Sequence, residues 1–165
     1  MPPASLRDGE YWARLVVSVK GGRVKVNGAE SSSVRVGLNV EVRSVLPVLY
    51  RKGALLTGLR LDHPRAMAFD DSVVTRAMLT RSGNAAFLGT LTVALLDARG
   101  KTVRTRALPL GVYYTLDPRV TLSTVGLAKG TYRVTFVAES ARPDLDRRSI
   151  VPAETVRGET VVVLR

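Results

Sequence analysis

The sequence predicts an all-β protein, and two observations carry this prediction. Apolar and polar residues alternate with a period of two in several segments, as they do in strands that bury one face. Turn-forming residues separate these segments at short, regular intervals, and this spacing of strands is typical of β-sandwiches. No segment carries the apolar stripe of an amphipathic helix, so we expect strands throughout and no helix.

Two long strands are expected in the amino-terminal third of the chain. The first, Gly9 to Lys20, is rich in β-branched and aromatic residues. The second runs from Val34 to Arg51 and is expected to pair antiparallel with the first through a long hairpin connection. Pro47 cannot donate to a ladder, which suggests an edge position, a bulge or a bend, so we expect the strand to kink or to change partner near this residue. Two strands cannot form a stable domain alone, and their sheet must be completed elsewhere.

The second strand begins with a regular apolar ladder. Its members alternate with charged or small residues, so they share one face of the strand: Val34, Val36, Leu38, Val40 and Val42. In one interpretation this ladder belongs to the protein's own core. In the other it is offered to a different chain, because long regular edge strands are templates for strand addition.

From Thr57 onward about seven strands follow, enough for a complete immunoglobulin-like β-sandwich. We expect Tyr132 to form a tyrosine corner, because it is the tyrosine of a Gly-x-Tyr pattern at the start of a late strand. In this motif the tyrosine hydroxyl forms a hydrogen bond with the backbone a few residues upstream. Residues 141–158 are expected to form a long exposed loop. We therefore predict two domains, residues 1–55 and 56–165. The expected strands are a short one at Leu59 and Leu61, Ser72 to Arg81, Phe87 to Leu96, Thr102 to Ala107, Leu110 to Thr115, one around Val120 and Leu122, one from Tyr132, and Glu159 to Leu164.

Composition narrows the function classes. The chain has 165 residues, a net charge of +11 and no cysteine, which excludes disulfides, thiolate metal sites and cysteine nucleophiles. The charge favours acidic partners in general, but the arginines are scattered and no aromatic platform accompanies them, so specific nucleic-acid binding is not expected. No apolar run approaches the length of a membrane span. Residues 1–8 lack the apolar core of a secretory signal peptide.

No set of residues in the sequence suggests catalysis. His63 is the only histidine, and it precedes Pro64 in an expected turn without a nucleophile motif. The adjacent acids Asp70 and Asp71 would diverge in an extended chain, and no further ligand joins Asp144 and Asp146. We expect no enzyme activity, no cofactor and no metal.

The order of several motifs resembles one family, the periplasmic chaperones of the chaperone/usher pilus pathway. Residues 8–15, Asp-Gly-Glu-Tyr-Trp-Ala-Arg-Leu, are similar to the family's "DGEYxxxL" segment, and Val34 to Gly53 to the long strand that follows it. Residues 81–84, with Phe87-Leu88-Gly89, resemble its "RxGN...YG" stretch. Residues 110–114 and 119–122 resemble its "VYxP...R" stretch.

The resemblance implies two immunoglobulin-like domains, a periplasmic location and a role in pilus assembly. The strand that carries the ladder from Val34 to Val42 would be donated to an incomplete pilus subunit. An usher would later exchange this strand for one from the next subunit. Arg51 matches the family arginine near the strand end and is a candidate basic contact, whereas Pro47 stands where the family has an anchoring lysine. About five preceding strands of the first domain have no counterpart, so residues 1–55 are expected to be a hairpin remnant. The exposed strands would then be covered by a client or, in a homodimer, by a second copy. The alternative function is a self-associating structural or surface protein without a client.

Overall fold

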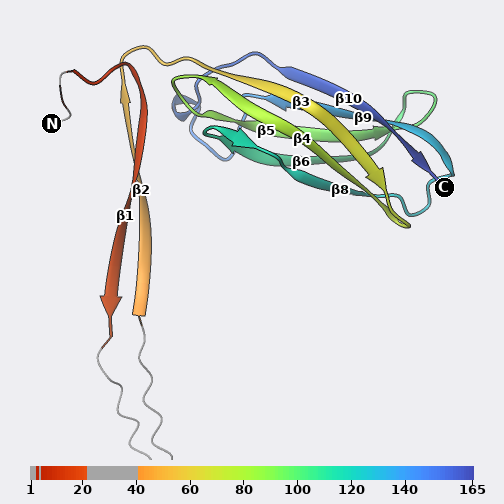
Figure 1. Cartoon of the computed structure of the whole chain (residues 1–165), viewed down its shortest axis with the longest axis horizontal. Helices are drawn as coiled ribbons and strands as arrows, with labels where there is room; N and C mark the ends of the chain where they lie inside the picture. The colour runs from red at the N-terminus through yellow and green to blue at the C-terminus, as the bar shows by residue number, and fades with distance from the viewer. Residues whose placement is uncertain (1–2, 4, 22–40) are drawn as a thin grey trace, which may run out of the picture. The chain divides into compact units, whose positions relative to one another are not determined.

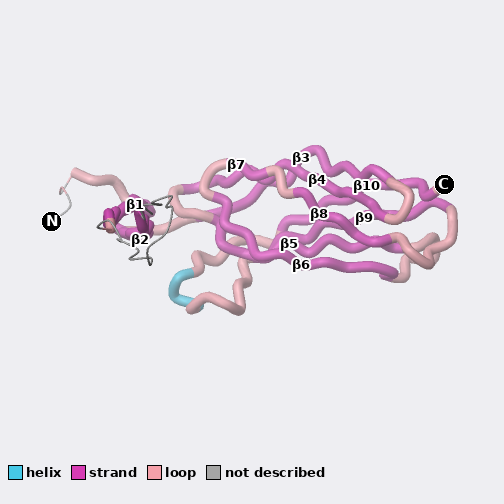
Figure 2. Tube along the Cα trace, turned by 90° about the horizontal axis from the view of Figure 1, so that it is seen from below, coloured by secondary structure: helices cyan, strands magenta, loops and turns pink. Residues whose placement is uncertain are grey.

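The computed structural model describes residue 3 and residues 5–21 and 41–165. Contacts divide the chain into two compact units, one made of Met1–Glu10 with Lys52–Arg165 and the other of Tyr11–Arg51. The described part of the chain is all-β with antiparallel sheets, as expected, and its one helical segment is the 3-10 turn Arg147–Ser149, cyan in Figure 2. The predicted division at residues 55 and 56 stays a prediction.

Strands β1 (Gly9–Lys20) and β2 (Glu41–Lys52) form a two-stranded sheet, which we call the ribbon. They run side by side in opposite directions (Figure 1). β2 passes through Pro47 without interruption and has only β1 as neighbour in the described part of the chain, so the expected change of partner is wrong, and the expected kink stays a prediction. The edge position is confirmed, because both strands of a two-stranded ribbon are edge strands.

The larger unit contains two antiparallel sheets. The first has the strand order β10-β9-β5-β6, and the second has the order β3-β4-β7, with β8 also paired to β4. Their strands are β3 (Thr57–Ala68), β4 (Ser72–Gly83), β5 (Phe87–Leu96), β6 (Thr102–Val112), β7 (Thr115–Leu116), β8 (Arg119–Ser123), β9 (Gly130–Glu139) and β10 (Val156–Leu164).

The two sheets of the larger unit enclose one core between them. Every second residue is buried in β5, in β8, in β9 from Tyr132 and in β4 from Val73 to Leu79, which is the alternation the sequence shows. The largest fully buried side chains include Phe87, Phe136, Leu79, Leu91 and Leu95. β10 lies next to β3 at one side of the sandwich in both Figure 1 and Figure 2, so the two sheets meet there.

Three expected strand limits are corrected by the structure. β3 does not end before His63, because the chain makes a register shift between Asp62 and Arg65 and then continues, with His63 at a φ of 50°. The two short strands expected around Pro109 are mostly one strand, β6, which ends at Val112, since an edge strand tolerates the missing N–H. β10 begins at Val156, three residues before the expected start.

The expected tyrosine corner is present. The hydroxyl of Tyr132 donates a hydrogen bond of 2.8 Å to the backbone carbonyl of Ala128, four residues upstream. The ring is buried in the core at the start of β9. The residue therefore fills the core with its ring and satisfies a loop carbonyl with its polar end.

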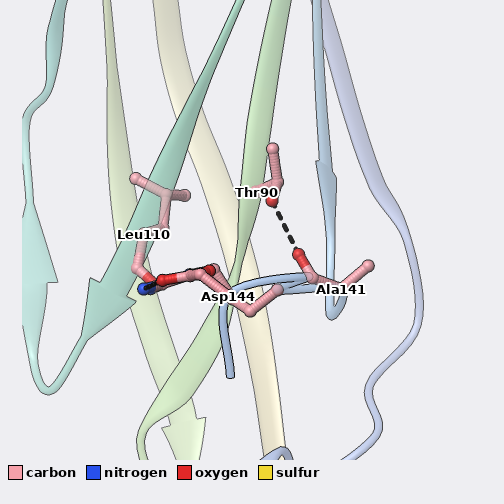
Figure 3. A network of polar contacts seen from close by, with 5 residues as sticks. Thr90, Leu110, Ala141 and Asp144 are labelled. Atoms are coloured by element: carbon pink, nitrogen blue, oxygen red, sulfur yellow. Dashed lines mark hydrogen bonds and ion pairs between the residues drawn. The ribbon is translucent and has the colours of Figure 1, made fainter. Parts of the chain in front are cut away.

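The loop between β9 and β10 is tied to the sandwich by a polar network (Figure 3). Arg142 donates to the carbonyl of Leu110 on β6 at 3.0 Å and forms a two-bond ion pair with Asp144, at 2.7 and 2.6 Å. Thr90 donates to the carbonyl of Ala141 at 2.6 Å. The Arg142 side chain is only 15% exposed, so this part of the predicted exposed loop is packed against the sheet.

Candidate interaction surface

The ribbon exposes an unusual number of large apolar side chains. They are between 40% and 60% exposed, although both strands have the composition of buried strands. Contiguous exposed apolar surface of this kind is uncommon in monomeric proteins and makes the ribbon a candidate interaction surface. The residues are Trp12, Leu15, Val16, Val17, Val19, Val42, Val45, Leu46, Val48, Leu49 and Tyr50.

A pair of aromatic rings fixes which residues of the two strands share a face. The rings of Tyr11 on β1 and Tyr50 on β2 lie 6.5 Å apart between centroids, which places both side chains on the same side of the ribbon. If these two residues are opposite each other, Gly9 pairs with Lys52 and Lys20 with Glu41, so the strands match end to end. Odd positions of β1 and even positions of β2 therefore share one face.

Between Tyr11 and Val19 on β1 and between Val42 and Tyr50 on β2, this assignment gives the ribbon one face without any charge, which we call the uncharged face. Lys52, the last residue of β2, lies on the same side beyond it and donates to the carbonyl of Leu6 at 2.6 Å. All but one of the residues of the uncharged face are apolar or aromatic, the exception being Ser44. A protein with 24% charged residues rarely leaves ten neighbouring positions without charge, so the face is suited to contact with another apolar surface. Its residues are Tyr11, Ala13, Leu15, Val17, Val19, Val42, Ser44, Leu46, Val48 and Tyr50.

The opposite face of the ribbon mixes apolar and basic residues, and we call it the cationic face. Arg43 on this face pairs with Glu41 at 2.9 Å, two positions away on the same strand. This face can remain in water while the uncharged face is covered. Its residues are Trp12, Arg14, Val16, Ser18 and Lys20 on β1, and Glu41, Arg43, Val45, Pro47, Leu49 and Arg51 on β2.

The sandwich protects its strand edges, in contrast to the ribbon. Arg104 and Arg106 on β6 donate to the carbonyls of Ser123 (3.1 Å) and Thr121 (3.3 Å) on the edge strand β8. At the other side, β10 packs beside β3 so closely that a Cβ on Gly158 would touch Leu61. Among the described residues neither ribbon strand has a second strand as neighbour, so both outer edges can accept one.

One member of the predicted donor ladder lies in the described part of the chain. Val42 is the second residue of β2, is 56% exposed and belongs to the uncharged face. The other predicted members, Val34, Val36, Leu38 and Val40, lie outside the described residues. The candidate basic residue Arg51 is the second-to-last residue of β2, on the cationic face.

The contribution of β1 to the uncharged face escaped the sequence analysis. Tyr11, Ala13, Leu15, Val17 and Val19 alternate regularly, which could have revealed it. The alternation is difficult to recognise because Trp12 and Val16, on the other face, are also apolar. The segment therefore resembles a nearly continuous apolar run. Only the pairing with β2 separates the two faces.

Within the sandwich unit, Asn84 joins the segments that precede β1 and follow β2. Its side-chain oxygen accepts from the backbone N–H of Leu56 at 2.8 Å, and its Nδ2 donates to the carbonyls of Asp8 (3.1 Å) and Ala54 (3.0 Å). The Asp8 carboxylate accepts from the N–H of Ala54 at 3.0 Å and occupies the space beside Gly53, whose φ is 64°. The asparagine of the "RxGN" motif therefore has a structural role in this chain.

Two of the acidic residues considered for metal binding are held in ion pairs. Asp144 and Asp146 are engaged by Arg142 and Arg148, and hydrogen bonds from these arginines hold the pKa of each carboxyl below its usual range. His63 lies in the β3 irregularity. No group of three or more potential metal-ligating side chains exists among residues 3, 5–21 and 41–165. No helix in the same part of the chain is long and apolar enough to cross a membrane.

Comparison of the chain with protein-family models, with curated proteins and with solved structures finds no match.

Proposed function

We propose that the chain is a non-enzymatic binding protein that uses the ribbon to complete the β-sheet of a partner by strand donation. The observation that carries this proposal is a two-stranded ribbon with two unpaired edges and the uncharged face. On the basis of the resemblance to pilus chaperones, we propose an incomplete pilus subunit as the partner and the periplasm as the location. An usher would then replace the donated strand by one from the next subunit. These assignments belong to the proposal.

The physics of strand addition matches the properties of β2. Backbone N–H and carbonyl groups along the free edge supply hydrogen bonds whatever the partner's sequence. Alternate side chains then set the register, because a slip by one residue would exchange the uncharged face for the cationic one. Val42, Leu46 and Val48 supply this alternation on β2, with exposures of 51% to 56%.

The topology of the sandwich supports an immunoglobulin-like assignment. Strands β3-β4-β8 take the places of strands A, B and E, and β10-β9-β5-β6 take those of G, F, C and C′ in the immunoglobulin arrangement. The Tyr132 bond to Ala128 lies at the start of the F-like strand β9, where that fold has its tyrosine corner. An immunoglobulin-like second domain is what the chaperone resemblance implies.

Charge substitutions on the two faces of β2 test strand donation. The test variant is Val42→Glu with Leu46→Glu, on the uncharged face, and the matched control is Val45→Glu with Leu49→Glu, on the cationic face, where the side chains are equally exposed. The partner is a purified pilus subunit that lacks its completing strand, and sizing with light scattering measures the complex. We expect a one-to-one complex with the unmodified chain and with the control, and no complex with the test variant. Equal binding by all three proteins would overturn the proposal.

The uncharged face also favours a second candidate, self-association through the ribbon. Two copies could pack these faces together without burying a charge, in a two-fold arrangement. From strand dimensions the face is about 30 Å long and 10 Å wide, so the two faces alone would bury on the order of 600 Å², less than the roughly 1,000 Å² of a stable interface, and a stable dimer would need further contacts. A dimer that Val42→Glu with Leu46→Glu converts to monomer, and that no incomplete subunit displaces, would support this function over strand donation.

A further inference from the structure

The outer face of the sheet formed by β3, β4 and β8 carries three arginines in one row across the strands. The register pairs Arg65 on β3 with Arg76 on β4, and Arg76 with Arg119 on β8. Arg76 points outward because the neighbouring positions Thr75 and Ala77 are buried. All three residues are exposed, and we call them the arginine row.

The arginine row has a single acidic counterpart within the described residues around it. Asp117 accepts from Arg76 at 3.2 and 2.9 Å, with both carboxylate oxygens engaged, and from Arg65 at 3.4 Å. The Arg119 side chain has no hydrogen-bond or ion-pair partner among the described residues. Like charges directly opposite each other destabilise a sheet, so folding gains nothing from the third arginine.

The outer face of the other sheet carries charge on only two of its four strands, with Arg133 and Glu139 on β9 and Arg157 and Glu159 on β10, so its basic and acidic residues are equal in number. The outward positions of β5 and β6 carry no charged residue, although the chain as a whole has a net charge of +11. The positive charge is therefore not spread evenly over the surface of the unit. The uncharged positions are Leu88, Thr90, Thr92, Ala94 and Leu96 on β5, and Thr105, Ala107, Pro109 and Gly111 on β6.

The row is bordered by an apolar pair on one side and by a methionine beside an ion pair on the other. Met67 and Val74 form the next pair along β3 and β4, and on the other side Met78 is paired with Asp62, which forms an ion pair with Arg60 at 2.7 Å. A hollow of about 100 Å³ next to the row is lined by His63, Arg65, Met78 and Asp117. Methionine side chains adapt to differently shaped partners, so the row has a deformable border.

We propose that the arginine row is a docking surface for an acidic polypeptide segment, whose carboxylates bind Arg119 and compete with Asp117 for Arg76. A carboxylate is the ligand because the row already holds one in a two-bond geometry. A nucleic acid fits less well, since the neighbouring pairs offer methionine, valine and threonine but no aromatic ring for stacking bases. The surface is independent of the ribbon and of the function proposed for it.

Binding of a fluorescent ten-residue peptide of alternating Glu and Ser, measured by anisotropy at low salt, tests this proposal. We expect Arg65→Gln with Arg76→Gln and Arg119→Gln to weaken binding by at least about tenfold. The matched control removes three arginines away from the row, Arg99→Gln with Arg133→Gln and Arg157→Gln, and should change binding by less than about twofold. Asp117→Asn should strengthen binding, because it frees Arg76 for the peptide.

Three results would overturn the proposal. The first is an equal loss of binding in the control, which would mean that the peptide senses only net charge. The second is unchanged or weaker binding by Asp117→Asn. The third is tighter binding, through the same arginines, of a single-stranded oligonucleotide of equal charge. Circular dichroism establishes that each variant is folded. Arg119→Gln alone, which removes no ion pair, repeats the test if the triple variant is unfolded, with an expected loss of about threefold.

Discussion

At the scale of single residues, small side chains at close contacts decide the packing of the sandwich. Gly89 on β5 faces the core, and a Cβ built there would overlap the backbone carbonyl of Glu139 and the ring of Phe87. The backbone oxygen belongs to the paired strand β9 and cannot rotate away. Gly111, on the adjacent strand β6, faces outward and would make only ordinary contacts at 3.6 Å.

We therefore expect Gly89→Ala to lower the free energy of unfolding by at least about 2 kcal/mol, because the strands must separate to admit the methyl group. Gly111→Ala, the matched control, should change stability by less than about 0.5 kcal/mol. Urea unfolding followed by circular dichroism measures both. Equal stability of the two variants would show that β5 and β9 do not approach as described.

At the scale of elements, the Arg142–Asp144 ion pair is one of the contacts that hold the loop after β9. The hydrogen bond from Arg142 lowers the pKa of the exposed Asp144 carboxyl, so the folded state releases this proton more readily than the unfolded chain. The stabilisation is present above the ordinary aspartate pKa of about 3.9 and is lost as the pH falls through the lowered folded-state pKa.

We expect the loop of residues 140–152 to loosen at acid pH before the core unfolds. The measurement is proteolysis by pepsin at a series of pH values below about 4, because the lowered pKa of Asp144 places its protonation below the ordinary aspartate value. Asp144→Asn should make the loop equally susceptible across this series. A pH response in the variant as large as in the unmodified chain would place the titrating group elsewhere.

At the scale of the whole molecule, the two compact units should differ in stability. The sandwich buries a continuous core, whereas the ribbon has two strands whose apolar residues are exposed on both faces. An isolated two-stranded sheet is at best marginally stable in water. Local opening of the ribbon therefore costs far less than unfolding of the sandwich.

Amide hydrogen exchange of the free chain measures this difference. We expect amides of β1 and β2 to exchange at least about a hundredfold faster than those of β5 and β9. Exchange in the ribbon should slow when a partner covers it, while β5 and β9 remain unchanged. Strong protection of the ribbon in a monomer would contradict the exposure on which the proposed function depends.

The sequence alone predicted much of the sandwich because its strands obey a strict local rule. β5 was predicted with its observed limits, and the Gly-x-Tyr pattern predicted the Tyr132 bond. These features follow from alternation and turn chemistry over a few neighbouring residues. The strand limits near His63 and Pro109 were wrong, because a bulge and an edge position depend on the neighbouring strand rather than on the local sequence.

The sequence by itself determined the class of structure, the ladder ending at Val42 and the absence of cysteine chemistry. Only the tertiary structure decided which residues share a face. Pairing brought Tyr11 beside Tyr50 and so separated the uncharged face of the ribbon from the cationic one. It also brought Arg65, Arg76 and Arg119 into one row, although up to 54 positions separate them in the sequence. Alternation specifies which residues of one strand lie together, but the register between strands is a property of the folded sheet.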